Sequence, residues 1–328
     1  MFKTKESELI LDDIRYLIDY SNLQDNLLYK RSNIFCNLDD FKSYSKDISM
    51  GIPMLLPTNL DYFDYDNYSS FKLNKEDIAN KIFMTDKLDY IGVKQFTEKG
   101  LEFSTGGTPV EKSLNIISYI SDINKKCKDL VNALTKKGKT VCAFQTRNIP
   151  HLGHERIIEE GLKHCDYVIV NPLIGVRKKG DFKTEVIEKA FQFLIENFYG
   201  NKVIYAPIIA NMFYAGPREA FHHSIIRQNI GFTHFIVGRD HAGAEGIYDE
   251  NAAFKNLKRN KLNIEVIPIE GAYYCTKKKS AVIKGVDNYD KNNLISISGT
   301  KFREAIISNT DFEFVRPELL NYIKKLGG

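Results

Sequence analysis

Residues 140–155 of the chain read TVCAFQTRNIPHLGHE. The first five residues are apolar or β-branched, which predicts a buried strand, and residues 154–163 have the apolar spacing of an amphipathic helix. The turn between them is dense in hydrogen-bond donors and contains two histidines separated only by Leu-Gly. A strand that passes through such a turn into a helix is typical of the start of a βαβ unit.

Short apolar runs and amphipathic segments alternate from here to the end of the chain. Expected strands are residues 140–144, 167–170, 203–209, 233–237, 264–269 and 294–297, and expected helices are residues 154–163, 185–198, 217–229 and 252–258. This alternation predicts an α/β fold, a doubly wound parallel sheet with crossover helices. Ligands bind such sheets beyond the carboxyl ends of the strands, so the residues that follow the strands should form the site.

The chain before this region has another composition. It is rich in Asp, Asn, Tyr and Ser, is interrupted by prolines and by residues 104–109, and ends in a long helical stretch that leads to Gly138. We therefore predict a smaller, mixed N-terminal domain at residues 1–136. A catalytic domain with a C-terminal helical segment is predicted at residues 137–328.

The overall composition is that of an ordinary globular protein of 328 residues, 43% hydrophobic and 27% charged. No run approaches the roughly 18 apolar residues of a membrane span. The N-terminus carries charges where a secretory signal needs an apolar segment. The five cysteines are scattered and lack zinc-ligand spacing, as suits reduced thiols. We expect a cytoplasmic protein with no membrane partner.

Charge is unevenly distributed along the chain. The formal net charge of +4 is divided into −4 over residues 1–135 and +8 over residues 136–328, and all seven histidines lie between His151 and His241. A modest positive excess with clustered histidines favours a polyanionic small molecule, such as a nucleotide. A nucleic-acid partner is not expected, because the sequence has no Lys/Arg-rich helix or alternation of aromatic and basic residues.

The loop after the first expected strand has the donors of an anion site. Backbone amides at a helix N-terminus favour a phosphate. Gly153 would allow the phosphate to approach the backbone closely, and Arg147 can bind an oxyanion with two hydrogen bonds. Two alternatives remain open. One is a polar turn whose histidines only cap the helix, and the other is a metal site, which no cysteine or carboxylate of suitable spacing supports.

Two further loops follow expected strands in the same way. Residues 238–243 read GRDHAG, and their Arg, Asp and His can bind an anion. Residues 296–303 read SISGTKFR, in which Ser298 or Thr300 can cap a helix whose N-terminus, with Arg303, can hold distal phosphates. The alternatives are a surface turn with a local ion pair and an ordinary helix start.

Other polar segments have weaker signals. Residues 171–181 and 214–219 follow expected strands and also carry cations. Histidines expected to pack in or near the core are His222, His223 and His234. Residues 107–113 look like a phosphate-binding P-loop but have Glu111 where the second glycine belongs, so no P-loop kinase domain is predicted.

Taken together, these segments resemble the ATP sulfurylase (sulfate adenylyltransferase) family of HIGH-motif nucleotidyltransferases. The blocks that look like family blocks, in the family's order, are residues 145–155, 172–181, 214–220, 231–243, 297–304 and 314–318. Residues 82–93 look like a degraded version of an earlier block, so the resemblance covers about residues 80–320.

The resemblance implies a PUA-like, β-rich N-terminal domain before the nucleotidyltransferase domain. It also implies the reaction of ATP with sulfate to give adenosine 5′-phosphosulfate and pyrophosphate, with Mg²⁺ on the nucleotide and a tendency to form homo-oligomers. Direct attack of an oxyanion on the α-phosphorus needs two polyanions brought into line and donors aimed at the transition-state charge. It needs no covalent intermediate.

The resemblance further assigns roles to individual residues. The implied catalytic residues are Thr146, Arg147, Asn148, His151 and His154. Sulfate would contact Gln145, Arg147 and the backbone at Ala242. The nucleotide would contact Gln145, Asn148, His151, His154, Gly238, Arg239, Asp240, His241, Ile267, Thr300 and Arg303.

Several residues depart from the family pattern. Leu152 stands where the family has arginine, Asn171 where it has histidine, and Phe213 where it has arginine. Only Cys275 remains of a late cysteine-rich zinc site, so no zinc is expected. Two alternatives therefore stay open beside a sulfate adenylyltransferase: a related enzyme with another oxyanion acceptor, such as a phosphorylated or phosphonate metabolite, and a non-catalytic nucleotide-binding regulator.

Overall fold

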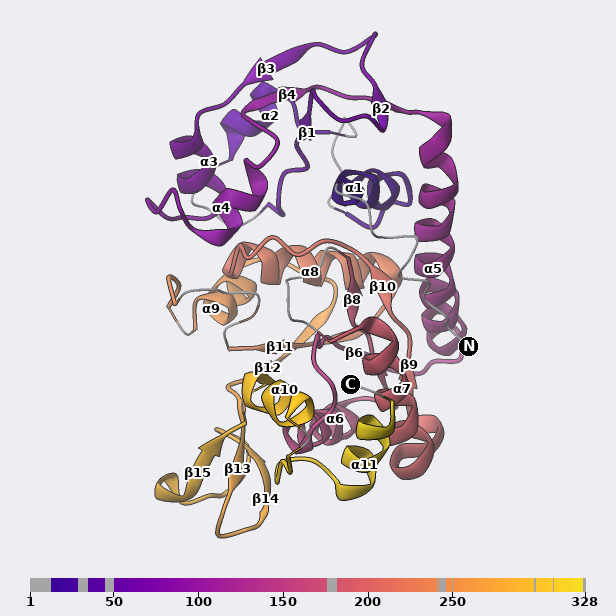
Figure 1. Ribbon diagram of the computed structural model, residues 1–328, viewed down its shortest axis with the longest axis vertical. Coiled ribbons are helices and arrows are strands. Elements are labelled where there is room, and N and C mark those ends of the chain that lie inside the picture. Colours follow the sequence, from indigo (N-terminus) through magenta and orange to yellow (C-terminus); the bar gives the residue numbers. More distant parts are fainter. Residues whose placement is uncertain are drawn as a thin grey trace.

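The computed structural model of the chain describes residues 13–28, 35–44, 50–175, 182–239, 241, 246–249, 251–297, 299–308 and 310–326. Its centre is a parallel sheet of five strands in the order β12-β11-β6-β7-β9 (Figure 1). These strands are β6 (Val141–Phe144), β7 (Tyr167–Val170), β9 (Val203–Tyr205), β11 (His234–Gly238) and β12 (Glu265–Ile269). The predicted α/β fold with a parallel sheet is confirmed.

The strand order places β6, the first strand of the sheet in the sequence, in the middle. The chain moves outward from β6 through β7 to β9 on one side, then adds β11 and β12 on the other. β6 and β11 pair in parallel, with Cys142 opposite His234. The order therefore reverses between β6 and β11, and ligands bind such sheets in the crevice beyond the carboxyl ends of the two strands at this point.

Helices cover both faces of the sheet, as Figure 1 shows. One face carries α6 (Leu152–His164), α7 (Thr184–Leu194), α10 (Gly299–Ile307) and α11 (Pro317–Lys325), and the other carries α5 (Glu111–Thr135), α8 (Pro217–Ile230) and α9 (Ala252–Arg259). Strand residues alternate between two apolar cores: Ala143 and Phe235 pack on the α8 side, and Cys142 and Ile236 on the α6 side. Burial on both faces explains why the strands are continuously apolar.

Two of the predicted strands differ from the structure. Residues 203–209 form two strands, β9 and β10 (Ile208–Ile209), and the latter pairs with β8 (Leu173–Ile174) because Pro207 has no amide to continue the first ladder. Residues 294–296 form β15, which pairs antiparallel with β13 (Ala272–Cys275), itself paired with β14 (Ser280–Ile283). The prediction of a sixth parallel strand is wrong, because turns rather than a crossover helix connect these strands.

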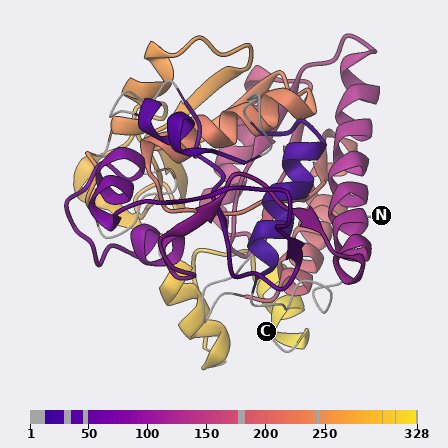
Figure 2. The ribbon, with the colours of Figure 1, turned by 90° about the horizontal axis from the view of Figure 1, so that it is seen from above.

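The N-terminal part is mixed, with short strands. Its helices are α1 (Ile14–Gln24), α2 (Leu38–Ser43), α3 (Lys75–Ile82) and α4 (Ile91–Phe96), and its strands are β1 (Leu56–Pro57), β2 (Phe63–Asp64), β3 (Ser70–Lys72), β4 (Glu102–Ser104) and β5 (Thr108–Pro109). Figure 2 shows α1, in indigo, beside α5. One apolar cluster joins Leu17 and Phe103 of this part to Val141 and Phe235 of the sheet. The two parts thus share a core, and the domain boundary at residue 136 stays a prediction.

Arg218 on α8 forms hydrogen bonds with the backbone of the N-terminal part. Its fully buried guanidinium donates hydrogen bonds from Nε to the carbonyl of Ile82 (3.2 Å), from Nη1 to that of Met50 (3.0 Å) and from Nη2 to that of Lys81 (2.9 Å). Arg218 therefore points toward the N-terminal part, where it satisfies backbone acceptors.

Arg218→Met is expected to lower the free energy of unfolding by about 3–5 kcal/mol. The substitution keeps an apolar stem but leaves three carbonyl oxygens without their charged donor, and each such loss costs about 1–3 kcal/mol, partly offset by relaxation. Urea unfolding measures the change. Arg259→Met, at an exposed position of α9, is the matched control and should shift stability by less than about 0.5 kcal/mol. Equal stability of the two variants would contradict this role of Arg218.

Candidate active site

The first polar loop leaves β6 at the middle of the sheet and enters α6. The Thr146 hydroxyl accepts a hydrogen bond from the backbone amide of Asn148 (3.2 Å) and lies 3.1 Å from Nε2 of His154. The hydroxyl proton can therefore be donated to Nε2, which holds the His154 ring against the loop. The ring also packs between Phe144 and Phe191. His154 is thus fixed by a strand, a loop and a neighbouring helix.

His151 caps α6 with its own side chain. Nδ1 accepts hydrogen bonds from the backbone amides of Gly153 (3.1 Å) and His154 (3.4 Å), so the proton of the neutral ring lies on Nε2. A Cβ at residue 153 would lie only 3.0 Å from the His151 ring, so Gly153 is needed for this cap. The cap interpretation is therefore correct for His151, which nevertheless keeps an Nε2–H donor for a ligand.

The two histidines are stacked and neutral. Their ring centroids are 3.8 Å apart with an angle of 19° between the planes. Burial lowers the pKa of His151 to about 4, and burial together with the neighbouring His151 lowers the pKa of His154 well below its usual value. At pH 7 both rings therefore act as hydrogen-bonding groups, and the positive potential at this edge comes from arginine and from the N-terminus of α6.

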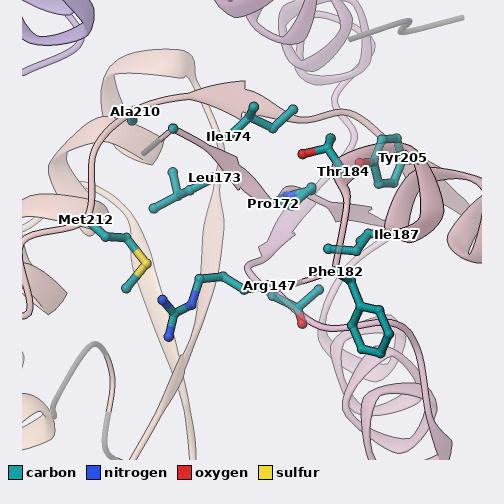
Figure 3. A pocket seen from close by; sticks show the side chains of 12 residues that line it. Arg147, Pro172, Leu173, Ile174, Phe182, Thr184, Ile187, Tyr205, Ala210 and Met212 are labelled. Carbon is teal, nitrogen blue, oxygen red and sulfur yellow. The ribbon is translucent and has the colours of Figure 1, made fainter. Parts of the chain in front are cut away.

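Arg147 is exposed and borders a small cavity of about 40 Å³ (Figure 3). The cavity is lined by Thr146, Arg147, Pro172, Leu173, Ile174, Gly175, Phe182, Thr184, Ile187, Tyr205, Ala210 and Met212. The guanidinium of Arg147 reaches the Met212 side, and Tyr205 lies across the cavity. Because a single water needs about 10–15 Å³, the cavity bounded by the described residues has room for a small ion.

The second polar loop follows β11 at the same sheet edge. The amide of Arg239 donates to the carbonyl of Ile269 on β12 (3.0 Å), which extends the ladder past Gly238. Nε2 of His241 lies 2.9 Å from Nδ1 of His223 on α8, and Arg147 acts electrostatically on His241. The structure thus brings this loop beside the first one. The predicted residues Asp240 and Ala242 lie outside the described residues.

The third polar loop meets the first at the start of α6. A Cβ on Gly153 would lie 3.2 Å from Cδ1 of Ile297, the residue that precedes the predicted Ser298 cap, which lies outside the described residues. Arg303 is half-buried on α10, and the side chain of Thr300 is not among those described. Ile267 on β12 packs in the α6-side core.

The late block of residues 314–318 fixes the start of α6. The backbone amide of Leu152 donates to the carbonyl of Phe314 (2.9 Å), and Nε of Arg316 lies 2.6 Å from the carboxylate of the almost fully buried Glu155. Leu152 therefore faces the groove beside Phe314 rather than the cavity at Arg147.

The other departures from the family pattern also lie away from the cavity. Asn171 is fully buried and donates to the carbonyl of Ala206 (2.6 Å), while its oxygen accepts from Arg227 (3.1 Å). Phe213 packs edge-on against Phe96 and His222. Neither is among the described residues that line the cavity. The two side chains lie outside the lining, although each residue is next in sequence to a lining residue, Asn171 to Pro172 and Phe213 to Met212.

Sequence reasoning missed the residues that surround Arg147. Nη1 of Arg147 donates to the hydroxyl of Tyr214 (3.2 Å), and Glu219 accepts from the backbone on both sides of that tyrosine. Residues 214–219 were quoted for their cations, whereas Arg218 and Glu219 prove to be fully buried. The signal was the Pro217-Arg218-Glu219 sequence at an expected helix start, where an acid in the first turn can accept backbone amides.

Within the described residues, no group of three or more His, Cys, Asp and Glu side chains is arranged to hold a metal ion. No helix in this part of the chain is both long enough and apolar enough to cross a bilayer.

A parallel sheet whose order reverses between two polar loops, with a histidine pair at the start of a helix, defines a HIGH-motif nucleotidyltransferase domain. A model of the ATP-sulfurylase family matches residues 122–326. The chain belongs to the ATP sulfurylase family.

Named relatives agree with this assignment. The sulfate adenylyltransferase of Ignicoccus hospitalis is 40% identical over 232 residues, which cover 69% of this chain and 60% of the relative. That of Thermococcus onnurineus is 32% identical over 348 residues, 98% of this chain and 91% of the relative. That of Pyrococcus abyssi is 37% identical over 259 residues, which cover 77% of this chain and 68% of the relative.

A solved structure shares the fold. The hexameric APS kinase from Thiobacillus denitrificans superposes with a TM-score of 0.57 at 12% identity, covering 95% of this chain and 62% of that chain. At this identity the likeness concerns the fold alone.

Acid is expected to destabilise the protein through its buried histidines. Burial lowers the pKa of His151 to about 4 and of His222 to about 3, from 6.5. Above pH 6.5 the two histidines are neutral in the folded and in the unfolded protein. Below pH 6.5 they take up protons first in the unfolded protein, so the free energy of unfolding falls as the pH is lowered. Each contributes about 1.4 kcal/mol per pH unit. Asp19 and Glu219, whose pKa burial raises to about 7, offset part of this.

The contribution of one histidine can be isolated with His222→Gln. Glutamine keeps an acceptor for the amide of Ile52, which His222 Nδ1 accepts at 3.4 Å, but does not titrate. Urea unfolding between pH 7 and 4.5 should show a shallower fall in stability for the variant. Parallel curves for the two proteins would show that His222 is not held neutral.

Proposed function

We propose that the chain is a sulfate adenylyltransferase, which converts ATP and sulfate to adenosine 5′-phosphosulfate and pyrophosphate. The observation that carries the proposal is the exposed Arg147 guanidinium beside a cavity of about 40 Å³, at the sheet edge where the histidine-capped helix α6 begins. Arginine binds tetrahedral oxyanions with two hydrogen bonds. The cavity has room for an inorganic oxyanion.

In the proposed reaction, an oxygen of sulfate attacks the α-phosphorus of ATP. A bond forms between a sulfate oxygen and the α-phosphorus. The bond between the α-phosphorus and the oxygen that bridges it to the β-phosphorus breaks, and pyrophosphate leaves with that electron pair. Arg147 and Gln145 hold sulfate, while Nε2–H of His151, the ring of His154 and the positive N-terminal end of α6 receive the phosphates. These groups stabilise charge that spreads over the phosphate oxygens in the transition state.

Nucleotide contacts are proposed for the remaining residues of the family pattern. They are Asn148, Gly238, Arg239, Asp240, His241, Ile267, Thr300 and Arg303, with Thr146 as a catalytic residue through His154 and the backbone of Ala242 as a sulfate contact. Mg²⁺ enters with ATP as part of the substrate. A PUA-like N-terminal domain at residues 1–136, a cytoplasmic location and homo-oligomers are likewise proposed from the family resemblance.

The alternative acceptor is a larger phosphorylated or phosphonate metabolite. It was suggested by Leu152, Asn171 and Phe213, but none of these is among the described residues that line the cavity. The non-catalytic alternative requires loss of the hydrogen-bond donors, whereas Arg147, His151 and His154 are all present in the sequence and the two histidine rings are stacked 3.8 Å apart. Both observations favour the sulfate adenylyltransferase.

Pyrophosphate release from MgATP, with and without sulfate, tests the proposed function. Molybdate is the second arm, because its unstable adenylyl product hydrolyses and draws the reaction forward. Release that depends on both oxyanions supports the proposal. Release that depends only on an added phosphorylated or phosphonate acceptor would replace it with the alternative enzyme. ATP binding without turnover under any acceptor would identify a regulator.

A further inference from the structure

We propose that Tyr214 and Glu219 are positioning residues that set the direction of the Arg147 guanidinium and thereby the affinity for sulfate. Neither is assigned to a ligand contact by the family pattern, and both lie on the segment that joins β10 to α8. The inference rests on the proposed function for the identity of the oxyanion.

Tyr214 is the one polar side chain seen to hold Arg147 among the described residues. Nη1 of Arg147 donates to the tyrosine hydroxyl at 3.2 Å, and the centre of the guanidinium lies 5.7 Å from the ring centroid. Arg147 is otherwise exposed on a flexible stem, whereas Tyr214 is 8% exposed. A buried ring with a single hydroxyl at its tip therefore restricts where the exposed cation can point.

The backbone of Tyr214 needs support to stay in this position. Its φ is +61°, in the left-handed region that costs a bulky residue about 1–2 kcal/mol. Such a conformation persists only when its surroundings impose it. The side chain direction of Tyr214 thus depends on whatever holds the residues on either side of it.

Glu219 supplies that support. It is fully buried in the first turn of α8, and its two carboxylate oxygens accept the backbone amides of Phe213 (2.9 Å) and Ala215 (2.9 Å), one on each side of Tyr214. The Tyr90 hydroxyl donates to the carbonyl of Tyr214 itself. A carboxylate is the only side-chain group that offers two acceptor oxygens in one plane without a donor, so glutamine must lose one of these bonds.

The same carboxylate is connected to the second polar loop. Oε1 of Glu219 lies 3.4 Å from Nε2 of His223, and Nδ1 of that histidine lies 2.9 Å from Nε2 of His241. Arg147 and His241, which belong to different loops, are thus held by groups that meet at Glu219. The primary test therefore uses Tyr214, whose hydroxyl faces Arg147 alone among the described contacts.

Tyr214→Phe removes the hydroxyl and keeps the ring and backbone. We expect KM for sulfate to rise about five- to tenfold, as for loss of one hydrogen bond to a charged group. KM for ATP should stay within about twofold of the wild-type value. The midpoint of thermal unfolding should stay within about 1 °C of wild type. Tyr65→Phe, which removes a hydroxyl that donates to the carbonyl of Pro57 (2.7 Å) in the N-terminal part, is the matched control and should leave KM for sulfate unchanged.

A double-mutant cycle separates positioning from a general effect. In an Arg147→Lys background, the Tyr214→Phe change should alter kcat/KM for sulfate by less than twofold. The reason is that the ammonium group of lysine does not reach the Tyr214 hydroxyl as the guanidinium does. Glu219→Gln should raise KM for sulfate at least as much as Tyr214→Phe. Additive effects in the cycle, or equal changes in KM for sulfate and ATP, would overturn the proposal.

Failure of the proposed function is distinguished by a binding measurement. The rise of the thermal midpoint with added sulfate reports binding without turnover. If the wild-type protein shows this rise but no sulfate-dependent turnover, the function is wrong, and a smaller rise for Tyr214→Phe still supports the positioning role. If sulfate gives neither effect in the wild-type protein, the positioning proposal fails together with the function.

Discussion

His154→Ala is expected to lower kcat for sulfate-dependent pyrophosphate release by about 100-fold or more, as for loss of a transition-state contact. The ring is held by Thr146 (3.1 Å) and packs against Phe144 and Phe191 at the start of α6. Because burial keeps the imidazole neutral, its loss removes a directed hydrogen-bonding group rather than a charge. ATP affinity should fall much less than kcat. Steady-state and single-turnover pyrophosphate release measure the effect.

Two further variants test whether misfolding, rather than loss of the imidazole, lowers kcat. His154→Asn keeps a polar group of smaller size and should also lose at least tenfold in kcat with a normal far-UV spectrum. His164→Ala lies in the last turn of the same helix, where the exposed ring contacts only Glu160 among the described residues (3.4 Å), and should retain normal turnover. A His154→Ala protein that keeps kcat within threefold of wild type would remove His154 from the mechanism.

Arg147→Met is expected to lower kcat/KM for sulfate by about 100- to 1000-fold, while the dissociation constant for ATP changes by less than threefold. Among the described residues that line the cavity, Arg147 is the one with a cationic side chain, and loss of a bidentate charged contact in the transition state costs about 3–4 kcal/mol. Methionine preserves most of the stem. Titration of each ligand by calorimetry, together with pyrophosphate-release kinetics, separates the two effects.

Stability should not explain the loss, because Arg147 is exposed and, among the described residues, only the Tyr214 hydroxyl loses a hydrogen-bond partner with it. The thermal midpoint of Arg147→Met is therefore expected within about 2 °C of wild type. Arg259→Met serves as the control for a lost surface arginine. Equal losses in sulfate and ATP affinity would mean that Arg147 contacts the nucleotide instead of the acceptor.

The parallel sheet could be predicted because its strands are buried on both faces. Four strand predictions, for residues 140–144, 167–170, 233–237 and 264–269, lie within one residue of β6, β7, β11 and β12. The fifth, residues 203–209, was divided by Pro207. Strand order was not readable, since pairing of β6 with β11 joins residues about ninety positions apart. What the sequence showed was that polar loops follow strands, and the carboxyl edge of a parallel sheet collects such loops.

Some features of the candidate site follow from the local sequence, and others depend on tertiary contacts. The residue types of the first loop, the helix start at His151 and the exclusion of a P-loop follow from the order of residues alone, because they depend on groups a few positions apart. The neutral state of the histidines, the inward direction of Arg218 and the support of Tyr214 by Glu219 depend on burial and on partners far along the chain. Sequence order carries the first kind of information directly. The second arises only when folding removes water and brings distant backbone groups within hydrogen-bond distance.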